Sequence, residues 1–165
     1  MLRQCSVASV IAATVVVVPL ALADGPGQKQ PGAGDAPLRA LEHVTVFVRN
    51  YDEAVSWYVG KLGLVKTEDQ RFGANERWLT VAPSADAATR IVLAVPSAGL
   101  ADSIGHQHNW VFRTGDCHAA HALLSSRGIH FLQEPREAPW GCQAIIEDLY
   151  GNHIVLLGSR AAEKS

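Results

Sequence analysis

The sequence predicts an α+β domain built from two tandem βαβββ modules that form a half-barrel cavity. The first observation is a repeated strand, because His43-Val-Thr-Val-Phe-Val-Arg-Asn50 has a counterpart in Asn109-Trp-Val-Phe-Arg-Thr-Gly-Asp116. The second is that each strand is followed by a helix of about ten residues, a Gly-containing stop and further short strands. We therefore expect His43 and Asn109 to face each other across a shared concave surface.

Apolar periodicity and turn residues place the individual elements. Strands are expected at 42–49, 64–70, 76–82, 89–95, 108–113, 129–133, 141–146 and 152–158. Helices are expected at 51–61 and 116–127, because each of these stretches follows or opens with an acidic or amide N-cap and ends near a glycine. The connection 96–106 joins the modules, either as a spacer or as a lid over the cavity.

Residues 1–23 have the features of a signal peptide. Arg3 precedes an apolar stretch that runs from Val7 to Leu22 and ends in Ala21-Leu22-Ala23. Cleavage after Ala23 is expected, which predicts a secreted or periplasmic protein without a stable membrane anchor. A membrane span is the alternative, but the apolar stretch is shorter than about 20 residues and is interrupted by Pro19.

The rest of the chain is expected to hold one domain. Hydrophobic residues make up 48% of the sequence and charged residues 18%, which is enough to bury a core. The net charge is −2 and no basic cluster stands out, so a nucleic-acid partner is not expected. The expected divisions are a flexible Gly- and Pro-rich linker at 24–40, a domain at 41–159 with modules 41–97 and 107–159, and a tail at 160–165.

Two cysteines remain after the expected cleavage, Cys117 and Cys142. An oxidising compartment would permit a disulfide between them. A domain with this much apolar content does not need one, and spacing alone does not bring two Cα atoms together. Two unpaired, partly buried thiols are therefore expected.

Two motifs carry a family resemblance. The run from His43 to Trp57-Tyr58-Val-Gly-Lys-Leu62-Gly63-Leu64 resembles the H-x-x-x-x-V…F-Y-x-x-x-L-G-F signature of the vicinal oxygen chelate superfamily. Asp148-Leu-Tyr-Gly151-Asn152-His-Ile-Val-Leu156 is similar to that superfamily's D-P-x-G-N-x-x-E-L ending. The superfamily includes glyoxalase I, extradiol dioxygenases, fosfomycin-resistance enzymes and bleomycin-binding proteins. The resemblance implies the two-module fold and a binding cavity.

In metal-dependent members, the resemblance implies one His and one Glu from each module as ligands of a divalent ion. The matching positions here are His43, Val92, Asn109 and Val155, of which only His43 is a good ligand. We therefore expect no cofactor. A divalent metal (Mn, Fe, Ni or Zn) on a rearranged site is the alternative, with His43 and His153 as ligands, since His153 shares a strand face with Val155.

The candidate ligand-binding residues are His43, Trp78, Arg90, Asn109 and His153. An indole and an imidazole can contact a flat molecule, and the guanidinium favours an anionic one. His118 and His121 lie one helical turn apart, but on an Ala-rich outer helix they are expected to form a polar face.

Three interpretations stay open. The first is an exported, metal-free protein that binds a small organic ligand, the second a metal-dependent lyase or dioxygenase-type enzyme, and the third a structural or interaction module. A homodimer is compatible with each of them.

Overall fold

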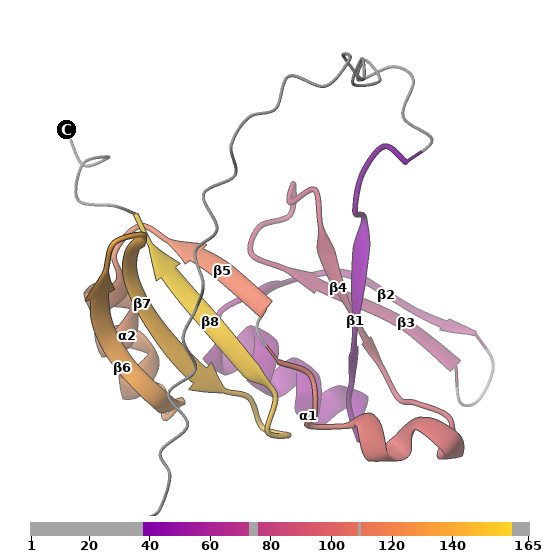
Figure 1. Ribbon diagram of the computed structural model, residues 1–165. Helices are drawn as coiled ribbons and strands as arrows, with labels where there is room; N and C mark the ends of the chain where they lie inside the picture. The colour runs from indigo at the N-terminus through magenta and orange to yellow at the C-terminus, as the bar shows by residue number, and fades with distance from the viewer. Residues whose placement is uncertain (1–37, 73–75, 109, 160–165) are drawn as a thin grey trace, which may run out of the picture. The chain divides into compact units, whose positions relative to one another are not determined.

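The computed structural model describes residues 38–72, 76–108 and 110–159 (Figure 1). The expected signal peptide 1–23, residues 24–37 of the expected linker, Asn109 and the tail 160–165 lie outside the described residues. All of the helices and strands that the structure describes belong to the unit from Ala40 to Ser165. Within the described ranges, no helix has the length and apolar character needed to cross a membrane.

Two βαβββ modules follow one another along the chain, as the sequence predicts. The first consists of β1 (His43–Phe47), α1 (Tyr51–Val55), the π-helix η1 (Ser56–Lys61), β2 (Val65–Phe72), β3 (Glu76–Ala82) and β4 (Arg90–Ala94). A 3₁₀ helix, η2 (Ala98–Ser103), lies in the connection. The second module consists of β5 (Trp110–Thr114), α2 (Cys117–Ser126), β6 (His130–Ala138), β7 (Gly141–Glu147) and β8 (His153–Gly158).

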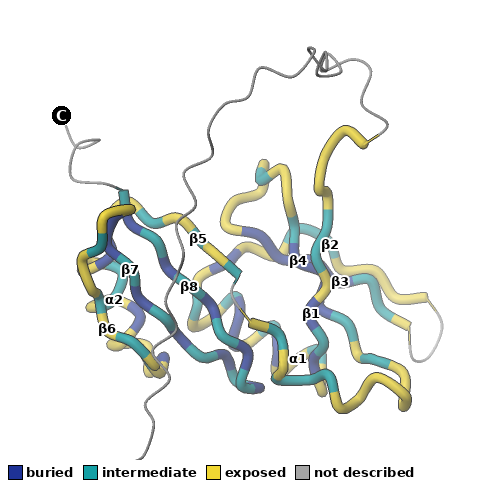
Figure 2. Tube along the Cα trace, in the orientation of Figure 1, coloured by how far each residue is buried: buried dark blue, intermediate teal, exposed yellow. Residues whose placement is uncertain are grey.

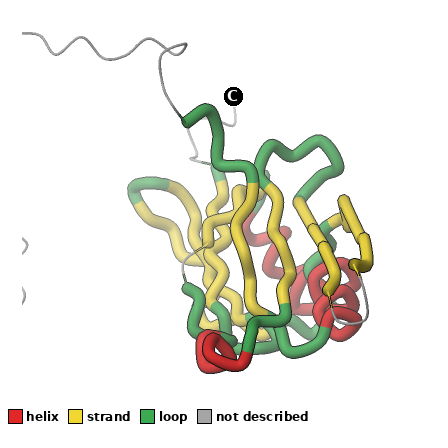
Figure 3. Tube along the Cα trace, turned by 90° about the vertical axis from the view of Figure 1, so that its right-hand side faces the viewer, coloured by secondary structure: helices red, strands yellow, loops and turns green. Residues whose placement is uncertain are grey.

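Each module forms its own four-stranded sheet, and the two sheets have the same topology. Sheet 1 has the order β1-β4-β3-β2, and sheet 2 has the order β5-β8-β7-β6 (Figure 1). Figure 3 shows the strands of the domain in yellow and its helices in red. The first and last strands of each module pair in parallel, and the other pairs are antiparallel. The repeat read from the sequence is therefore a repeat of topology.

Both helices begin where the sequence predicts, because a side chain caps each one. Asn50 Oδ1 accepts hydrogen bonds from the backbone N–H groups of Asp52 and Glu53, and Asp116 caps α2 in the same way. The strand expected at 129–133 is longer, since β6 continues to Ala138. The pairing of β6 with β7 shifts between Gln133 and Arg136, around Pro135, which cannot donate to the ladder.

A single apolar core joins the two modules. The fully buried members of one cluster include Val46 and Leu93 from sheet 1, Tyr58 from η1, and Ile146 and Ile154 from sheet 2. Buried segments, dark blue in Figure 2, occur in both sheets. Polar bridges add to this contact. The Gln107 side chain accepts from Phe47 N–H and donates to the Thr45 carbonyl, and the Gln107 carbonyl accepts from His153 N–H. The start of β8 is thereby tied to the edge of β1.

The two cysteines are joined by a disulfide, so the expectation of unpaired thiols is wrong. Cys117 opens α2 and Cys142 lies in β7, with Cα atoms 5.9 Å apart, inside the range that a disulfide requires. Gly158 makes this approach possible, because a Cβ there would lie 3.1 Å from the Cβ of Cys117. The sequence does not show that the helix start packs against these strands.

Candidate functional site

The two faces of sheet 1 differ in character. Alternate residues, including Val46, Leu79 and Leu93, point into the core. The opposite face, which we call the polar face, contains Thr45 and Thr80 in register with Val92, and Glu68 in register with Thr80. A sheet face that carries hydroxyls and charges is not built for core packing. It is the part of the first module with the chemistry to hold a polar ligand.

Four side chains of the polar face form a connected group, which we call the Glu68 cluster: His43, Glu68, Trp78 and Arg90. Glu68 accepts a 2.8 Å hydrogen bond from Trp78 Nε1 and a 3.0 Å ion-pair bond from Arg90 Nη1. The His43 ring meets the Trp78 ring edge-on, with centroids 5.4 Å apart. Glu68 therefore holds an indole and a guanidinium in fixed positions beside an imidazole.

Two polar atoms of this cluster lack partners. His43 Nε2 and Arg90 Nε are buried, and neither has a hydrogen-bond partner among the described residues. The Nε–H of arginine is a donor in every accessible protonation state. Leaving such a group buried and unpaired costs about 1–3 kcal/mol, so most buried polar groups are satisfied. An acceptor oxygen of a bound molecule would remove this cost.

The structure brings three of the five predicted ligand-binding residues together. His43, Trp78 and Arg90 lie in the Glu68 cluster, on three different strands. His153 lies on β8 of sheet 2, where its ring packs against that of His108 at a centroid distance of 4.3 Å. Asn109 lies outside the described residues, so the predicted contact between Asn109 and His43 stays a prediction.

Glu68 is the member of the site that the sequence does not predict. A register shift between Lys66 and Glu68 changes the alternation along β2. Both faces of this strand carry polar residues, from Lys66 to Gln70, so no apolar pattern indicates which of them point toward the site. The acidic group of the site therefore comes from β2, at the edge of sheet 1, and not from β4, where the resemblance implies a Glu.

A hollow of about 510 Å³ lies between the two modules. Its walls are mainly apolar and include Val44 and Ile91 of sheet 1 and Trp110 and Phe112 of β5. Val44 and Ile91 neighbour His43 and Arg90 in sequence, so they point to the opposite face of sheet 1. The Glu68 cluster therefore faces away from this hollow.

Comparison with known proteins identifies the family. The profile of the Glyoxalase/Bleomycin resistance protein/Dioxygenase superfamily matches residues 40–156. The chain belongs to this superfamily.

Solved structures of similar proteins share the fold. TnmS3, described as an antibiotic binding protein from Streptomyces sp. CB03234, is 31% identical, with a TM-score of 0.67 over 75% of this chain and 98% of its own. A superfamily member from Sphaerobacter thermophilus DSM 20745 is 27% identical, with a TM-score of 0.66 over 74% of this chain and 98% of its own. An uncharacterized protein of Shewanella frigidimarina is 32% identical over 69% of this chain and 89% of its own length.

The residues do not fit the divalent ion that metal-dependent members of the superfamily hold. Val92, at one of the four implied positions, is a buried apolar side chain between Thr45 and Thr80. Val155, at another, lies in register with Val111 and Ile145. Of the three described positions only His43 offers a metal ligand, and one imidazole does not balance the charge of a divalent ion.

Proposed function

We propose that this superfamily member is an exported protein that binds a flat, oxygen-bearing organic molecule on the polar face of sheet 1, without a metal ion. The observation that carries the proposal is the pair of unpartnered atoms, His43 Nε2 and Arg90 Nε, beside the Trp78 ring. Trp78 supplies an apolar surface for an aromatic ring, and Arg90 supplies a hydrogen-bond donor for an acceptor oxygen. A ligand that carries both groups fits this pair. The 31% identity to TnmS3, described as an antibiotic binding protein, supports the binding of a small molecule.

The charge of the site limits the ligand further. Glu68 already pairs with Arg90, and both side chains are about one-third exposed. The guanidinium charge is thus largely balanced, so a neutral carbonyl or phenol oxygen satisfies the free Nε–H as well as a carboxylate does. The proposed ligand class therefore includes uncharged aromatic molecules.

Equilibrium dialysis tests the proposal with three groups of probes: planar aromatic carboxylates, their uncharged amides, and antibiotics with flat aromatic rings. Saturable one-to-one binding is expected for at least one probe group. Trp78→Leu should lower the affinity by about 0.5–1.5 kcal/mol of lost ring contact, and Arg90→Gln should also weaken binding. Trp140→Leu is the matched control, since Trp140 is an exposed tryptophan on the β6–β7 hairpin. Equal effects of Trp78→Leu and Trp140→Leu would refute the site.

We extend the proposal to a homodimer formed along β5. Among the described residues β5 pairs only with β8, so its other edge has no strand partner. Val111 on this strand is 57% exposed and lines the apolar hollow between the modules. A second copy would cover both. Light scattering should give the dimer mass for the parent and the monomer mass for Val111→Lys; a monomeric parent would refute the extension.

Export is proposed from residues 1–23, which carry the signal-peptide features. Intact mass of the secreted protein should correspond to a chain that begins at Asp24. Full-length protein that stays in the membrane fraction would contradict this.

A further inference from the structure

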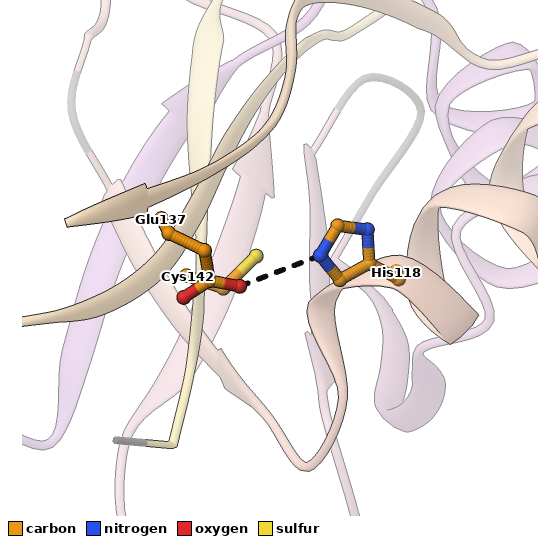
Figure 4. A group of neighbouring side chains, drawn as sticks. All are labelled: His118, Glu137 and Cys142. Atoms are coloured by element: carbon orange, nitrogen blue, oxygen red, sulfur yellow. Dashed lines mark hydrogen bonds and ion pairs between the residues drawn. The ribbon is translucent and has the colours of Figure 1, made fainter. Parts of the chain in front are cut away.

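A group of side chains of the types that bind metals lies at the start of α2, separate in its residues from the Glu68 cluster. His118, Glu137 and Cys142 each place one ligand atom within 4.8 Å of the others (Figure 4). His118 Nε2 lies 3.4 Å from Glu137 Oε1, and Glu137 is the cross-strand neighbour of Cys142 in the β6–β7 hairpin. An imidazole, a carboxylate and a sulfur thus converge from one helix and two strands.

Cys117 brings a second sulfur to this group. It precedes His118 on α2 and is disulfide-bonded to Cys142. All four side chains line one hollow of about 190 Å³. The side chains of His118 and Glu137 are 65% and 73% exposed, so an ion from solution reaches the hollow freely. Two Cys, one His and one carboxylate make up a ligand number and type that Zn²⁺ accepts in tetrahedral sites.

The oxidation state of the sulfurs decides whether this site exists. Metals bind the thiolate form of cysteine, and a disulfide sulfur carries no such charge. In the oxidised chain only His118 and Glu137 offer strong ligand atoms, too few for a tight site. In the reduced chain the two thiolates complete the set of four.

We propose that reduction of the Cys117–Cys142 disulfide creates a Zn²⁺ site made of Cys117, Cys142, His118 and Glu137. A dithiol supplies the two electrons: its thiols become a disulfide, the protein S–S bond breaks, both protein thiolates bind the ion, and two protons are released. In the reverse step a small-molecule disulfide accepts the two electrons and, with two protons from solvent, becomes a dithiol, while the protein S–S bond re-forms and the ion is released. Two thiolates and a carboxylate bring three negative charges against the two positive charges of the ion, and the N-terminus of α2 offsets part of the excess.

A purely structural disulfide is the simpler interpretation, because a disulfide stabilises without any ligand nearby, and exposed His–Glu pairs contribute little. It gives no reason for an imidazole and a carboxylate to converge on the sulfur. The two interpretations differ in one measurable property, which is metal binding after reduction.

The experiment uses the chain that begins at Asp24, the product expected after export, reduced with a dithiol that is then removed without air. Calorimetric titration with Zn²⁺ should show one ion per reduced chain and no saturable binding by the oxidised chain. Co²⁺ as a spectroscopic substitute should give thiolate charge-transfer absorption that disappears on reoxidation. A reduced chain that binds no metal, or an oxidised chain that binds it equally well, would overturn the proposal.

Variants that keep both cysteines test the other two ligands. His118→Ala and Glu137→Gln each remove a direct ligand. Each should lower the affinity for Zn²⁺ at least as much as the loss of an outer-shell partner, which is roughly 10- to 100-fold. The matched controls are His121→Ala and Glu134→Gln. His121 lies on the same helix as His118, and its ring packs against that of Phe131 at a centroid distance of 4.5 Å. Glu134 lies on the same strand as Glu137. If all four variants bind Zn²⁺ like the parent, the cysteines act alone and the four-ligand site is wrong.

Circular dichroism covers the case in which the reduced chain unfolds. Metal binding that requires the folded site adds its free energy to folding. Zn²⁺ should then restore the native spectrum of the reduced parent and not that of His118→Ala. A reduced chain that Zn²⁺ leaves unfolded would also overturn the proposal.

Discussion

The Tyr58 hydroxyl donates a 2.5 Å hydrogen bond to Asp148 Oδ2, and so connects the helical segment of the first module to the turn before β8 of the second. Asp148 Oδ1 accepts from the N–H groups of Tyr150 and Asn152, and Oδ2 also accepts from Asn152 Nδ2. The buried carboxylate thus has four donors. The two motifs that carry the family resemblance, ninety residues apart, meet in one hydrogen-bonded group.

Tyr58→Phe should lower the free energy of unfolding by about 1–3 kcal/mol, because it removes one donor from a buried carboxylate. Urea denaturation measures the difference. Tyr51→Phe is the control, since among the described residues the Tyr51 hydroxyl accepts one long bond, 3.4 Å from Val95 N–H, in an exposed setting. Equal losses of unfolding free energy in the two variants would show that the Tyr58–Asp148 bond contributes no more to stability than the exposed Tyr51 bond.

Stability should fall at alkaline pH. Burial, followed by the nearby Asp148 carboxylate, raises the pKa of Tyr58 well above its usual value. Above about pH 10 the unfolded chain therefore loses this proton while the folded chain keeps it, and stability falls by up to about 1.4 kcal/mol per pH unit. Burial also raises the pKa of Tyr150. In urea titrations above pH 10, Tyr58→Phe should show a shallower fall than the parent, and an unchanged slope would contradict this assignment.

The fold was predictable because its signals are local. The first strand of each module, its capping residue and its Gly stop recur in order, and Asn50 and Asp116 do cap their helices. The members of the site were harder to predict. His43, Trp78 and Arg90 could be chosen by residue type and strand parity, whereas Glu68 depends on a bulge and Cys117–Cys142 on the packing of a helix against a sheet. Both are tertiary relationships without a periodic signature.

Gly105→Ala should destabilise the chain by about 1–3 kcal/mol, because Gly105 has a φ of +82° and an added Cβ would overlap the Tyr150 carbonyl oxygen. Gly99→Ala is the matched control in the same connection, since a Cβ there meets no atom within 4 Å. Thermal or urea unfolding compares them. Two variants of equal stability would mean that the backbone near Gly105 and Tyr150 moves to accommodate the added Cβ at little cost.

Glu68→Gln should shift ligand preference toward anions, a prediction that rests on the proposed function. The change leaves the Arg90 charge unbalanced while an amide oxygen still accepts from Trp78 Nε1. The Glu68–Arg90 ion pair, about one-third exposed, contributes only about 0–1 kcal/mol to stability, so the fold should be retained. Binding of a planar aromatic carboxylate and its amide, measured by dialysis on parent and variant, should show the ratio of affinities moving toward the carboxylate. A ratio that moves toward the amide would place the ligand away from Arg90.

The final prediction concerns the metal positions of the superfamily. The triple variant Val92→Glu, Asn109→His and Val155→Glu, together with the native His43, supplies the two imidazoles and two carboxylates that the resemblance implies. Without metal the variant should be less stable than the parent, because Val92 is 6% exposed and a carboxylate there loses its hydration. Added Mn²⁺, Ni²⁺ or Zn²⁺ should raise its free energy of unfolding by about 2.7 kcal/mol at a hundredfold excess over Kd, if the ion binds only the folded state.

The parent in its oxidised form is the control. Its free energy of unfolding should not change when these ions are added, because His43 alone does not hold them, and a chelator should not change it either. A folded triple variant without saturable one-to-one binding in calorimetry would show that these four positions do not converge on one point, and that the alignment of the two modules must be shifted.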